Sequence, residues 1–330
     1  MRAILAFDSF KGCLTADAVC EAAAAGFLPD DRLCLLPLSD GGEGFARLLT
    51  QNAGGQWLSA PTQDPLGRPI LAGYGLIGDT AVIEVAAATG LGRLRQEERD
   101  PLQTSSYGTG LLIANAIGRG CKQILLGLGG SATNDGGAGL VEAVGDLLRR
   151  HAVGLTACYD TEIRFAEATA LYGPQKGVNE TNRAQVEQRM RDLERRYGPE
   201  RMQQAGTGAA GGIGGAVVYL GGRLKPGADV LLDQLHFETL IRDLQADLIL
   251  TGEGCFDRQT LTGKLPLKVA LRASVPVYAL AGKVMVTSDP HFQEIIAVTP
   301  EGTPPDVALR PDFAQQQITR QVRLLRQRLA

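Results

Sequence analysis

The sequence is poor in the residues on which zinc sites and hydrolytic triads depend. Its 330 residues include only three histidines, and His151, His236 and His291 lie far apart. Its six cysteines form no CxxC pair and no Cys/His spacing of the kind that binds metal, so reduced thiols are expected. No Ser/His/Asp or Cys/His triad is suggested, which argues against nucleophilic catalysis of that type.

The sequence also lacks a strong excess of either charge and any long hydrophobic run. Its formal net charge is −3 and it has one tryptophan, so nothing points to a nucleic-acid partner. No apolar run reaches transmembrane length, and the first residues show no cleavable signal pattern. We therefore expect a cytoplasmic protein with no nucleic-acid or membrane partner.

Glycine, by contrast, is abundant, and it gathers at the ends of the expected strands. The richest stretch is GLGGSATNDGGAG at 127–139, between an apolar run at 123–126 and the expected start of a helix at 140–144. Glycine lets the backbone approach a ligand closely, and consecutive N–H groups at a helix N-terminus bind anions. The polar members of the stretch, which could hydrogen-bond a ligand or hold a cation, are Ser131, Thr133, Asn134 and Asp135. The alternative is a turn that only packs a strand against a helix.

The order of the apolar runs predicts an α/β fold. Strands are expected at 3–7, 32–38, 247–250, 276–281 and 294–298, an antiparallel hairpin at 70–76 and 80–85, and helices at 16–27, 107–119, 181–197, 206–222 and 315–329. We predict two α/β domains. A doubly wound parallel sheet is built from both chain ends, residues 1–58 and 228–330, and an inserted domain, residues 59–227, carries the glycine-rich stretch. A single continuous sheet is the alternative.

Acidic residues and lysines follow four of the expected strands. They are Asp8 and Lys11, Asp40 and Glu43, Glu253 and Asp257, and Lys283. Ligands of open α/β sheets bind beyond the carboxyl ends of the strands, where these side chains would gather. Each one alone is more simply explained as a helix cap or a surface charge. Together with the glycine-rich stretch they indicate phosphoryl transfer, which needs a divalent metal, cations and a carboxylate near the acceptor hydroxyl.

Two familiar phosphate-binding motifs are excluded. The sequence contains no GxxxxGK[ST], so it is not a P-loop protein. Residues 206–211 spell GxGxxG, but residues 201–205 before them form no strand, and we reject a dinucleotide fingerprint there. The residues alone therefore predict a small-molecule kinase outside the P-loop class.

Several motifs, in the same order along the chain, make the sequence resemble the bacterial glycerate kinase family. They are FDSFKG at 7–12, SDGGEG at 39–44, GGSATNDGG at 129–137, YGPQKG at 172–177, GAAGG at 208–212, and TGEG at 251–254 followed by Asp257, QTL at 259–261 and GK at 263–264. The resemblance implies ATP-dependent phosphorylation of D-glycerate, of the type that makes 2-phosphoglycerate, with ATP and Mg²⁺. It also implies two α/β domains that enclose the site, one of them a split Rossmann-like domain, and it leaves a homodimer open.

On this basis we assign roles to individual residues as hypotheses. Asp8 accepts the proton of the substrate hydroxyl. Lys11 neutralises the phosphoryl group or binds the glycerate carboxylate, and Asp40 or Asp135 holds Mg²⁺. The residues expected to bind the nucleotide and its phosphates are Gly129, Gly130, Ser131, Thr133, Asn134, Gly136 and Lys283. Those expected to bind the substrate are Ser9, Lys176 and Glu253, and a solvated surface charge is the alternative for Lys176.

The sequence departs from the family pattern in one region. The segment between Leu148 and Tyr172 is short, and where the family usually has a CDVxNPL-like motif it reads Cys158-Tyr159-Asp160. Cysteine also stands at positions 13 and 255, where Ser and Arg would be more usual. Two other functions therefore stay open: a kinase of another small hydroxy acid, and a non-catalytic protein that binds glycerate or nucleotide. The set of acids Asp8, Asp40, Asp135 and Glu253 argues against a protein that only binds.

Overall fold

A computed structural model describes residues 1–42 and 44–329, so the expectation for Glu43 lies outside the described residues. The chain divides into two compact units. Unit 1 consists of Met1–Asp40 and Leu231–Ala330, and unit 2 of Gly41–Val230. We expected the first boundary at residue 58, but the helix α2 (Phe45–Asn52) packs on three strands of the second sheet and belongs to unit 2.

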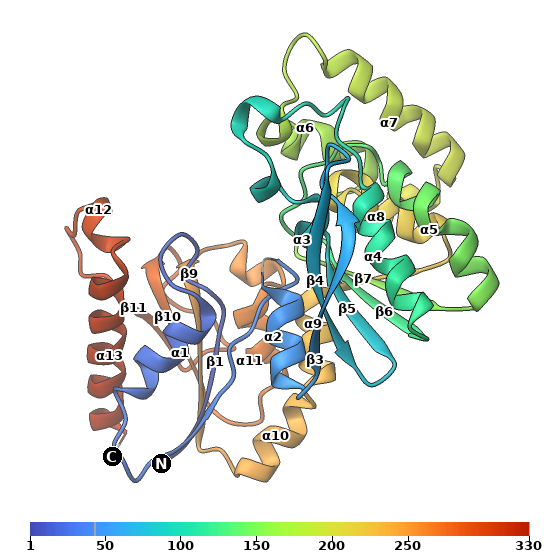
Figure 1. Cartoon of the computed structure of the whole chain (residues 1–330). Coiled ribbons are helices and arrows are strands. Elements are labelled where there is room, and N and C mark those ends of the chain that lie inside the picture. Colours follow the sequence, from blue (N-terminus) through green and yellow to red (C-terminus); the bar gives the residue numbers. More distant parts are fainter. Residues whose placement is uncertain (43, 330) are drawn as a thin grey trace. The chain divides into compact units, whose positions relative to one another are not determined.

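Unit 1 is a parallel five-stranded sheet in the order β11-β10-β9-β1-β2. Its strands are β1 (Arg2–Phe7), β2 (Arg32–Leu35), β9 (Leu248–Phe256), β10 (Val277–Val284) and β11 (Glu294–Ala297). Its helices are α1 (Ala16–Ala24), α10 (Phe237–Leu244), α11 (Leu265–Arg272), α12 (Pro305–Ala308) and α13 (Pro311–Arg328). Figure 1 shows α1 and α13 side by side, and their apolar faces share one core with Leu5, Phe7 and Leu250.

Both faces of this sheet are covered, as the doubly wound prediction requires. Leu5 and Leu250 are buried toward α1 and α13, and their neighbours Ile4 and Ile249, which point the opposite way along each strand, are also fully buried. The expected helix start at Thr15 is confirmed, because its hydroxyl accepts a hydrogen bond from the amide of Ala18 at 3.3 Å.

Unit 2 is a mixed six-stranded sheet in the order β3-β4-β5-β6-β7-β8. Its strands are β3 (Gln56–Gln63), β4 (Pro69–Ile77), β5 (Thr80–Glu84), β6 (Gln123–Gly127), β7 (Gly154–Tyr159) and β8 (Arg223–Pro226). Its other α-helices are α3 (Val85–Thr89), α4 (Tyr107–Gly118), α5 (Ala138–His151), α6 (Ala168–Tyr172), α7 (Arg183–Tyr197) and α8 (Ala209–Tyr219), and α9 (Gly227–Gln234) crosses the boundary to unit 1.

The two sheets confirm a mixed α/β fold and replace the alternative of one continuous sheet. The antiparallel hairpin of β4 and β5 is confirmed, whereas β3, which pairs antiparallel with β4, was not predicted. Its sequence QWLSAPTQ contains Pro61, and a proline is tolerated here because β3 is an edge strand. Among the described residues, no helix is both long and apolar enough to cross a membrane.

Two strands of unit 1 extend further than expected, and this changes where two functional side chains lie. We expected β9 to end at 250 and β10 at 281, but both continue through their glycine-containing ends, pairing Glu253 with Ala281 and Cys255 with Lys283. Gly252 allows this close pairing, because a Cβ there would lie 1.8 Å from the Leu280 carbonyl oxygen. Glu253 and Lys283 are therefore strand residues and not loop residues.

Candidate active-site groups in the two units

The glycine-rich loop of unit 2 connects β6 to α5. Gly130, Gly136 and Gly137 have φ values of 70°, 62° and 74°, in the left-handed region that favours glycine. Gly129 has a different reason to be glycine, because a Cβ there would lie 2.5 Å from Cα of Gly42. An antiparallel bridge from Gly90 to Ser131 holds the other side of the loop, with the Leu91 amide donating to the Gly130 carbonyl at 2.9 Å.

Several backbone N–H groups of this loop have no acceptor within the described part of the chain. They belong to Gly130, Ser131, Thr133, Asn134 and Asp135. The amides of Gly129 and Gly136, by contrast, donate to the carbonyls of Gly41 and Gly211 at 3.2 and 3.0 Å. Backbone donors are normally paired with protein or water. A run of unpaired donors in a glycine-rich loop before a helix is the arrangement that binds phosphate oxygens.

Lys176 lies behind this loop and is buried, so the solvated surface charge considered for it is wrong. Its ammonium donates to the Ser131 hydroxyl oxygen at 2.7 Å and to the Thr133 carbonyl at 2.9 Å. Burial lowers the pKa of Lys176 to about 7, and the nearby carboxylate of Asp135 opposes that shift. The lysine comes from the short helix η4 (Pro174–Lys176), 45 residues away from Ser131.

The side chains of Thr133 and Asn134 face the protein interior. Both residues are fully buried, and the Asn134 amide nitrogen donates to the Thr169 hydroxyl at 2.9 Å. The Thr133 hydroxyl and the Asn134 amide oxygen have no hydrogen-bond partner among the described residues. The side chains that the sequence analysis emphasised at these two positions are therefore turned to the interior and not exposed to a ligand.

Asp135, expected as a metal ligand, is surrounded by hydrogen-bond donors. One oxygen accepts from the Ser106 amide, the Ser106 hydroxyl and the Gly139 amide at 2.9, 2.8 and 3.2 Å, and the other from the Gly137 amide at 3.0 Å. The carboxylate is buried and lies at the start of α5, where it complements the helix dipole. This arrangement gives Asp135 a structural role, and its expected role as a metal ligand stays a prediction.

Unit 1 brings together three acidic residues at the carboxyl edge of its sheet. Asp8 follows β1, and Phe7 is paired with Gly252, which places Glu253 beside Asp8. Burial raises the pKa of Asp8 to about 8, and the charges of Asp40 and Glu253 add to the shift, while the Ser9 amide, 2.6 Å from one Asp8 oxygen, works against it. The expected gathering of these acids is thus present within unit 1.

Glu253 has defined partners on the neighbouring segment. One of its oxygens accepts from the Thr260 hydroxyl at 2.6 Å, and the other lies 3.4 Å from the Lys264 ammonium. Burial raises the pKa of Glu253, and these two partners oppose the shift. The pKa of Lys264 is raised because nearby Glu253, Asp257 and Asp40 outweigh the effect of its own partial burial. Lys264 was in a recognised motif but was not among the expected site residues.

Two further lysines of unit 1 that the sequence analysis singled out, Lys11 and Lys283, are exposed. Lys11 follows Asp8 in the loop before α1, and Lys283 lies on β10 beside Cys255. The backbone of Gly254 approaches this loop closely, because a Cβ at Gly254 would lie 3.3 Å from the Lys11 amide nitrogen. Both ammonium groups are exposed, and the roles expected for them stay predictions.

The carboxylates of unit 1 fit a magnesium ion that is bound mainly by its substrate. No group of three or more histidine, cysteine or acidic side chains within the described residues could by itself hold a metal. Mg²⁺ in kinases is usually bound by one or two carboxylates together with phosphate oxygens, so no such cage is required.

The short region between 148 and 172 forms part of the unit 2 sheet. Cys158 is buried in β7, where burial raises its pKa to about 12, and its carbonyl accepts from the Leu128 amide at 3.0 Å. The segment therefore supports the start of the glycine-rich loop. The rejected GxGxxG at 206–211 has a packing role, because a Cβ at Gly211 would lie 2.0 Å from the Thr133 carbonyl oxygen.

An α/β protein with a phosphate-type glycine loop and an acid–lysine cluster belongs by these features to the class of phosphotransferases outside the P-loop group. The Glycerate kinase family matches the chain at residues 3–153 and 152–323. The chain is a member of this family.

Curated relatives cover most of the chain. A glycerate kinase of Halalkalibacterium halodurans is 37% identical, with 85% of each chain covered. The glycerate kinase of Bacillus subtilis is 35% identical, with 92% of each covered, and the glycerate 2-kinase of Escherichia coli is 34% identical, with 86% of each covered. A crystal structure of a protein described as a candidate glycerate kinase 2 from Salmonella typhimurium LT2 is 33% identical and superimposes with a TM-score of 0.82, covering 100% of this chain and 98% of that one.

Proposed function

We propose that this protein transfers the γ-phosphoryl group of ATP to D-glycerate and forms 2-phosphoglycerate. The observation that carries the proposal is the set of backbone N–H groups in the glycine-rich loop that have no acceptor within the described residues. They belong to Gly130, Ser131, Thr133, Asn134 and Asp135, whereas the Ala132 amide between them donates to the Thr89 carbonyl at 2.8 Å. The relatives named glycerate kinase and glycerate 2-kinase support glycerate as the acceptor and its 2-hydroxyl as the position. We also propose a cytoplasmic location, because ATP is the donor.

In this proposal the loop of unit 2 binds the phosphates of ATP. The backbone N–H groups of Gly130, Ser131, Thr133 and Asn134 would donate to phosphate oxygens. The Ser131 hydroxyl oxygen already accepts from Lys176, so its own hydrogen is left to donate. Gly129 and Gly136 shape the loop and do not donate to the ligand, because their N–H groups are bonded to protein carbonyls.

The acid–lysine cluster of unit 1 would handle the acceptor. Asp8, whose pKa lies at about 8, is suited to accept the proton of the attacking hydroxyl near neutral pH. Lys11 and Lys283 would neutralise anionic groups of the substrates, and Ser9 would position the acceptor. Glu253, fixed by Thr260 and Lys264, would orient the substrate.

Of the two acids expected to hold Mg²⁺, we propose Asp40, because the donors around Asp135 occupy both oxygens of that carboxylate. Mg²⁺ supplies charge neutralisation on the transferring phosphoryl group when it is bound. Asp40 is a half-buried carboxylate near Asp8 and Lys264, which suits a ligand shared with substrate oxygens.

The test is an assay of purified protein with Mg-ATP and D-glycerate that follows ADP release and separates 2- from 3-phosphoglycerate by ³¹P NMR. L-glycerate, lactate and other small hydroxy acids serve as matched acceptors. Formation of 2-phosphoglycerate, with D-glycerate giving the highest kcat/KM, is expected. Preference for another acid would replace the acceptor, and ATP binding without ADP release for any acid would favour a binding protein.

A further inference from the structure

The glycine-rich loop is held from behind by two cations, of which Lys176 is buried and Arg189 is partly buried. Lys176 binds the Thr133 carbonyl, as described above. Arg189, on α7, donates from one guanidinium nitrogen to the Asn134 carbonyl at 2.6 Å and to the Pro101 carbonyl at 2.5 Å. Burial lowers the pKa of Arg189, and Asp135 and Asp100 oppose the shift. Lys176 is buried, and the guanidinium of the partly buried Arg189 is bonded to two backbone carbonyls.

Because each peptide unit is planar, the contacts of these two carbonyls also determine which way the neighbouring N–H groups point. A trans peptide is planar, so its C=O and N–H point in opposite directions. The Thr133 carbonyl points toward Lys176, and the N–H of the same peptide belongs to Asn134. The Asn134 carbonyl points toward Arg189, and the N–H of that peptide belongs to Asp135. Both N–H groups are therefore turned away from the cations, and within the described residues neither has an acceptor.

We propose that Lys176 and Arg189 are positioning residues that never touch the ligand: they bind the loop carbonyls from behind so that the Asn134 and Asp135 amides face the phosphates of the nucleotide. This inference rests on the proposed function, in which the loop binds ATP phosphates. It reassigns Lys176, which the sequence analysis placed among the substrate-binding residues.

Two further contacts make the arrangement rigid. Gly177 has a φ of 95°, and a Cβ there would lie 1.9 Å from the Arg99 carbonyl oxygen, so the backbone next to Lys176 cannot easily shift. The Gly211 backbone packs against the Thr133 carbonyl from α8. The cations therefore hold carbonyls whose positions are already restricted, and a donor is needed because a buried carbonyl without one is costly.

The first experiment compares Lys176→Met and Arg189→Met, which keep most of the side-chain volume and remove every donor. Lys122→Met and Arg195→Met are the controls, because both residues are exposed, in unit 2, and bind no part of the loop. Dissociation constants for ATP, ADP, AMP and inorganic tripolyphosphate are measured by calorimetry. Loss of a charge-assisted hydrogen bond predicts about tenfold weaker binding of ATP and tripolyphosphate, with a smaller loss for AMP and none in the controls.

The phosphate series separates positioning from a merely structural effect, because general destabilisation would weaken all four ligands alike. Folded Met variants that bind ATP and tripolyphosphate as the unchanged protein does would overturn the inference and leave the proposed function intact. An unchanged protein that binds neither would overturn both. If the unchanged protein binds tripolyphosphate but not ATP, ATP is not the phosphoryl donor. The effect of the Met substitutions on the loop is then measured with tripolyphosphate alone.

A second experiment needs no variant and tests the direction of the loop amides even if the Met variants do not fold. Backbone amide resonances of the ¹⁵N-labelled protein are followed while tripolyphosphate is added. The amide protons of Asn134 and Asp135 are expected to move downfield, and those of Gly129 and Gly136, already bonded to protein carbonyls, to move little. The reverse pattern would show that the loop peptides face the other way and would contradict the inference.

Discussion

The carboxylate of Asp135 accepts hydrogen bonds from both the backbone amide and the hydroxyl of Ser106, which lies 29 residues earlier in the chain. The hydroxyl of Ser106 in turn accepts from the Leu140 amide at 3.0 Å. This pair therefore joins the start of α4 to the start of α5, and it satisfies backbone donors at a buried helix end.

Asp135→Asn should destabilise the protein without changing its dependence on magnesium. The amide nitrogen of the new side chain would face backbone donors, and leaving such buried groups unpaired costs about 2 kcal/mol. Urea unfolding measures the loss, and Asp146→Asn, at an exposed position on the same helix, is the control. A normal stability combined with a raised magnesium requirement would instead restore Asp135 as a metal ligand.

Most strands and helices could be predicted from the sequence, because the apolar runs and turn residues that indicate them are local. The apolar runs of β1 and β6 are bounded by loop residues, and the hairpin of β4 and β5 is separated by the short turn at Gly78. β3 was missed because its burial depends on pairing with β4 and its sequence includes Pro61. The extension of β9 was missed because TGEG is typical of a loop, and only pairing with β10 makes it a strand.

The site was less readable, because residue type does not reveal the partner that a side chain finds in space. The glycine-rich loop itself could be predicted from its composition. Whether Lys176 is exposed or buried depends on a contact with Ser131, 45 residues away, and no periodicity encodes that contact. Arg189 was not predicted either, because it lies on a strongly charged helix whose other arginines are mostly solvated. A resemblance of motifs identifies which residues recur, and not which of them touch ligand.

Asp8→Asn should lower turnover strongly and leave the fold intact. Loss of a general base typically costs 10² to 10⁴ in rate, so we expect kcat to fall about 10³-fold. Stability should hold or rise, because the substitution removes a buried group whose charged form is disfavoured by burial and by the charges of Asp40 and Glu253. Steady-state kinetics and thermal unfolding check both parts, with the exposed Asp30→Asn as control. Full activity would remove Asp8 from the proposed mechanism.

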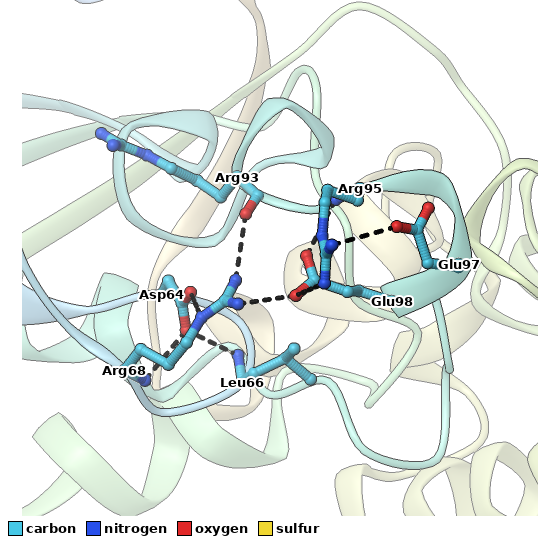
Figure 2. A network of polar contacts seen from close by, with 7 residues as sticks. All are labelled: Asp64, Leu66, Arg68, Arg93, Arg95, Glu97 and Glu98. Carbon is cyan, nitrogen blue, oxygen red and sulfur yellow. Dashed lines mark hydrogen bonds and ion pairs between the residues drawn. The ribbon is translucent and has the colours of Figure 1, made fainter.

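Arg68→Ala should destabilise unit 2 more than Arg95→Ala does. Figure 2 shows Arg68 at the centre of a network, bound to the buried carboxylate of Asp64, to Glu98 at 2.7 Å and to the Arg93 carbonyl at 3.2 Å. Among the described residues, the Arg95 side chain forms ion pairs with Glu97 and Glu98, both at 3.3 Å, and it is 72% exposed. The segment held by Arg68 includes Leu91, which bonds to Gly130.

For Arg68→Ala we expect a loss of about 1 to 2 kcal/mol in the free energy of unfolding, because a charged pair with a buried partner exceeds an exposed one, and for Arg95→Ala a loss of about 0.5 kcal/mol or less. Binding of ATP should weaken only in the Arg68 variant, since its segment supports the glycine-rich loop. Equal effects of the two substitutions on unfolding and on ATP affinity would show that the network is an ordinary surface cluster.

The burial of Lys176 predicts how stability depends on pH. Its pKa is lowered to about 7 in the folded protein, and an unfolded lysine titrates near 10.4. Below pH 7 the lysine is protonated in both states, and the cost of burying its charge is complete. Between these two values the unfolded state binds more protons, so stability rises with pH by at most about 1.4 kcal/mol per unit.

The quantity to measure is therefore the difference in unfolding free energy between the unchanged protein and Lys176→Met. It is measured from about pH 6.5 to about pH 9.5, a range that covers most of the interval between the two pKa values. It should shift in favour of the unchanged protein as pH rises, because Met carries no titrating proton. Lys122→Met, at an exposed site, should give a difference that stays constant. A constant difference for Lys176→Met as well would mean that the lysine keeps its proton and that Asp135 offsets its burial in full.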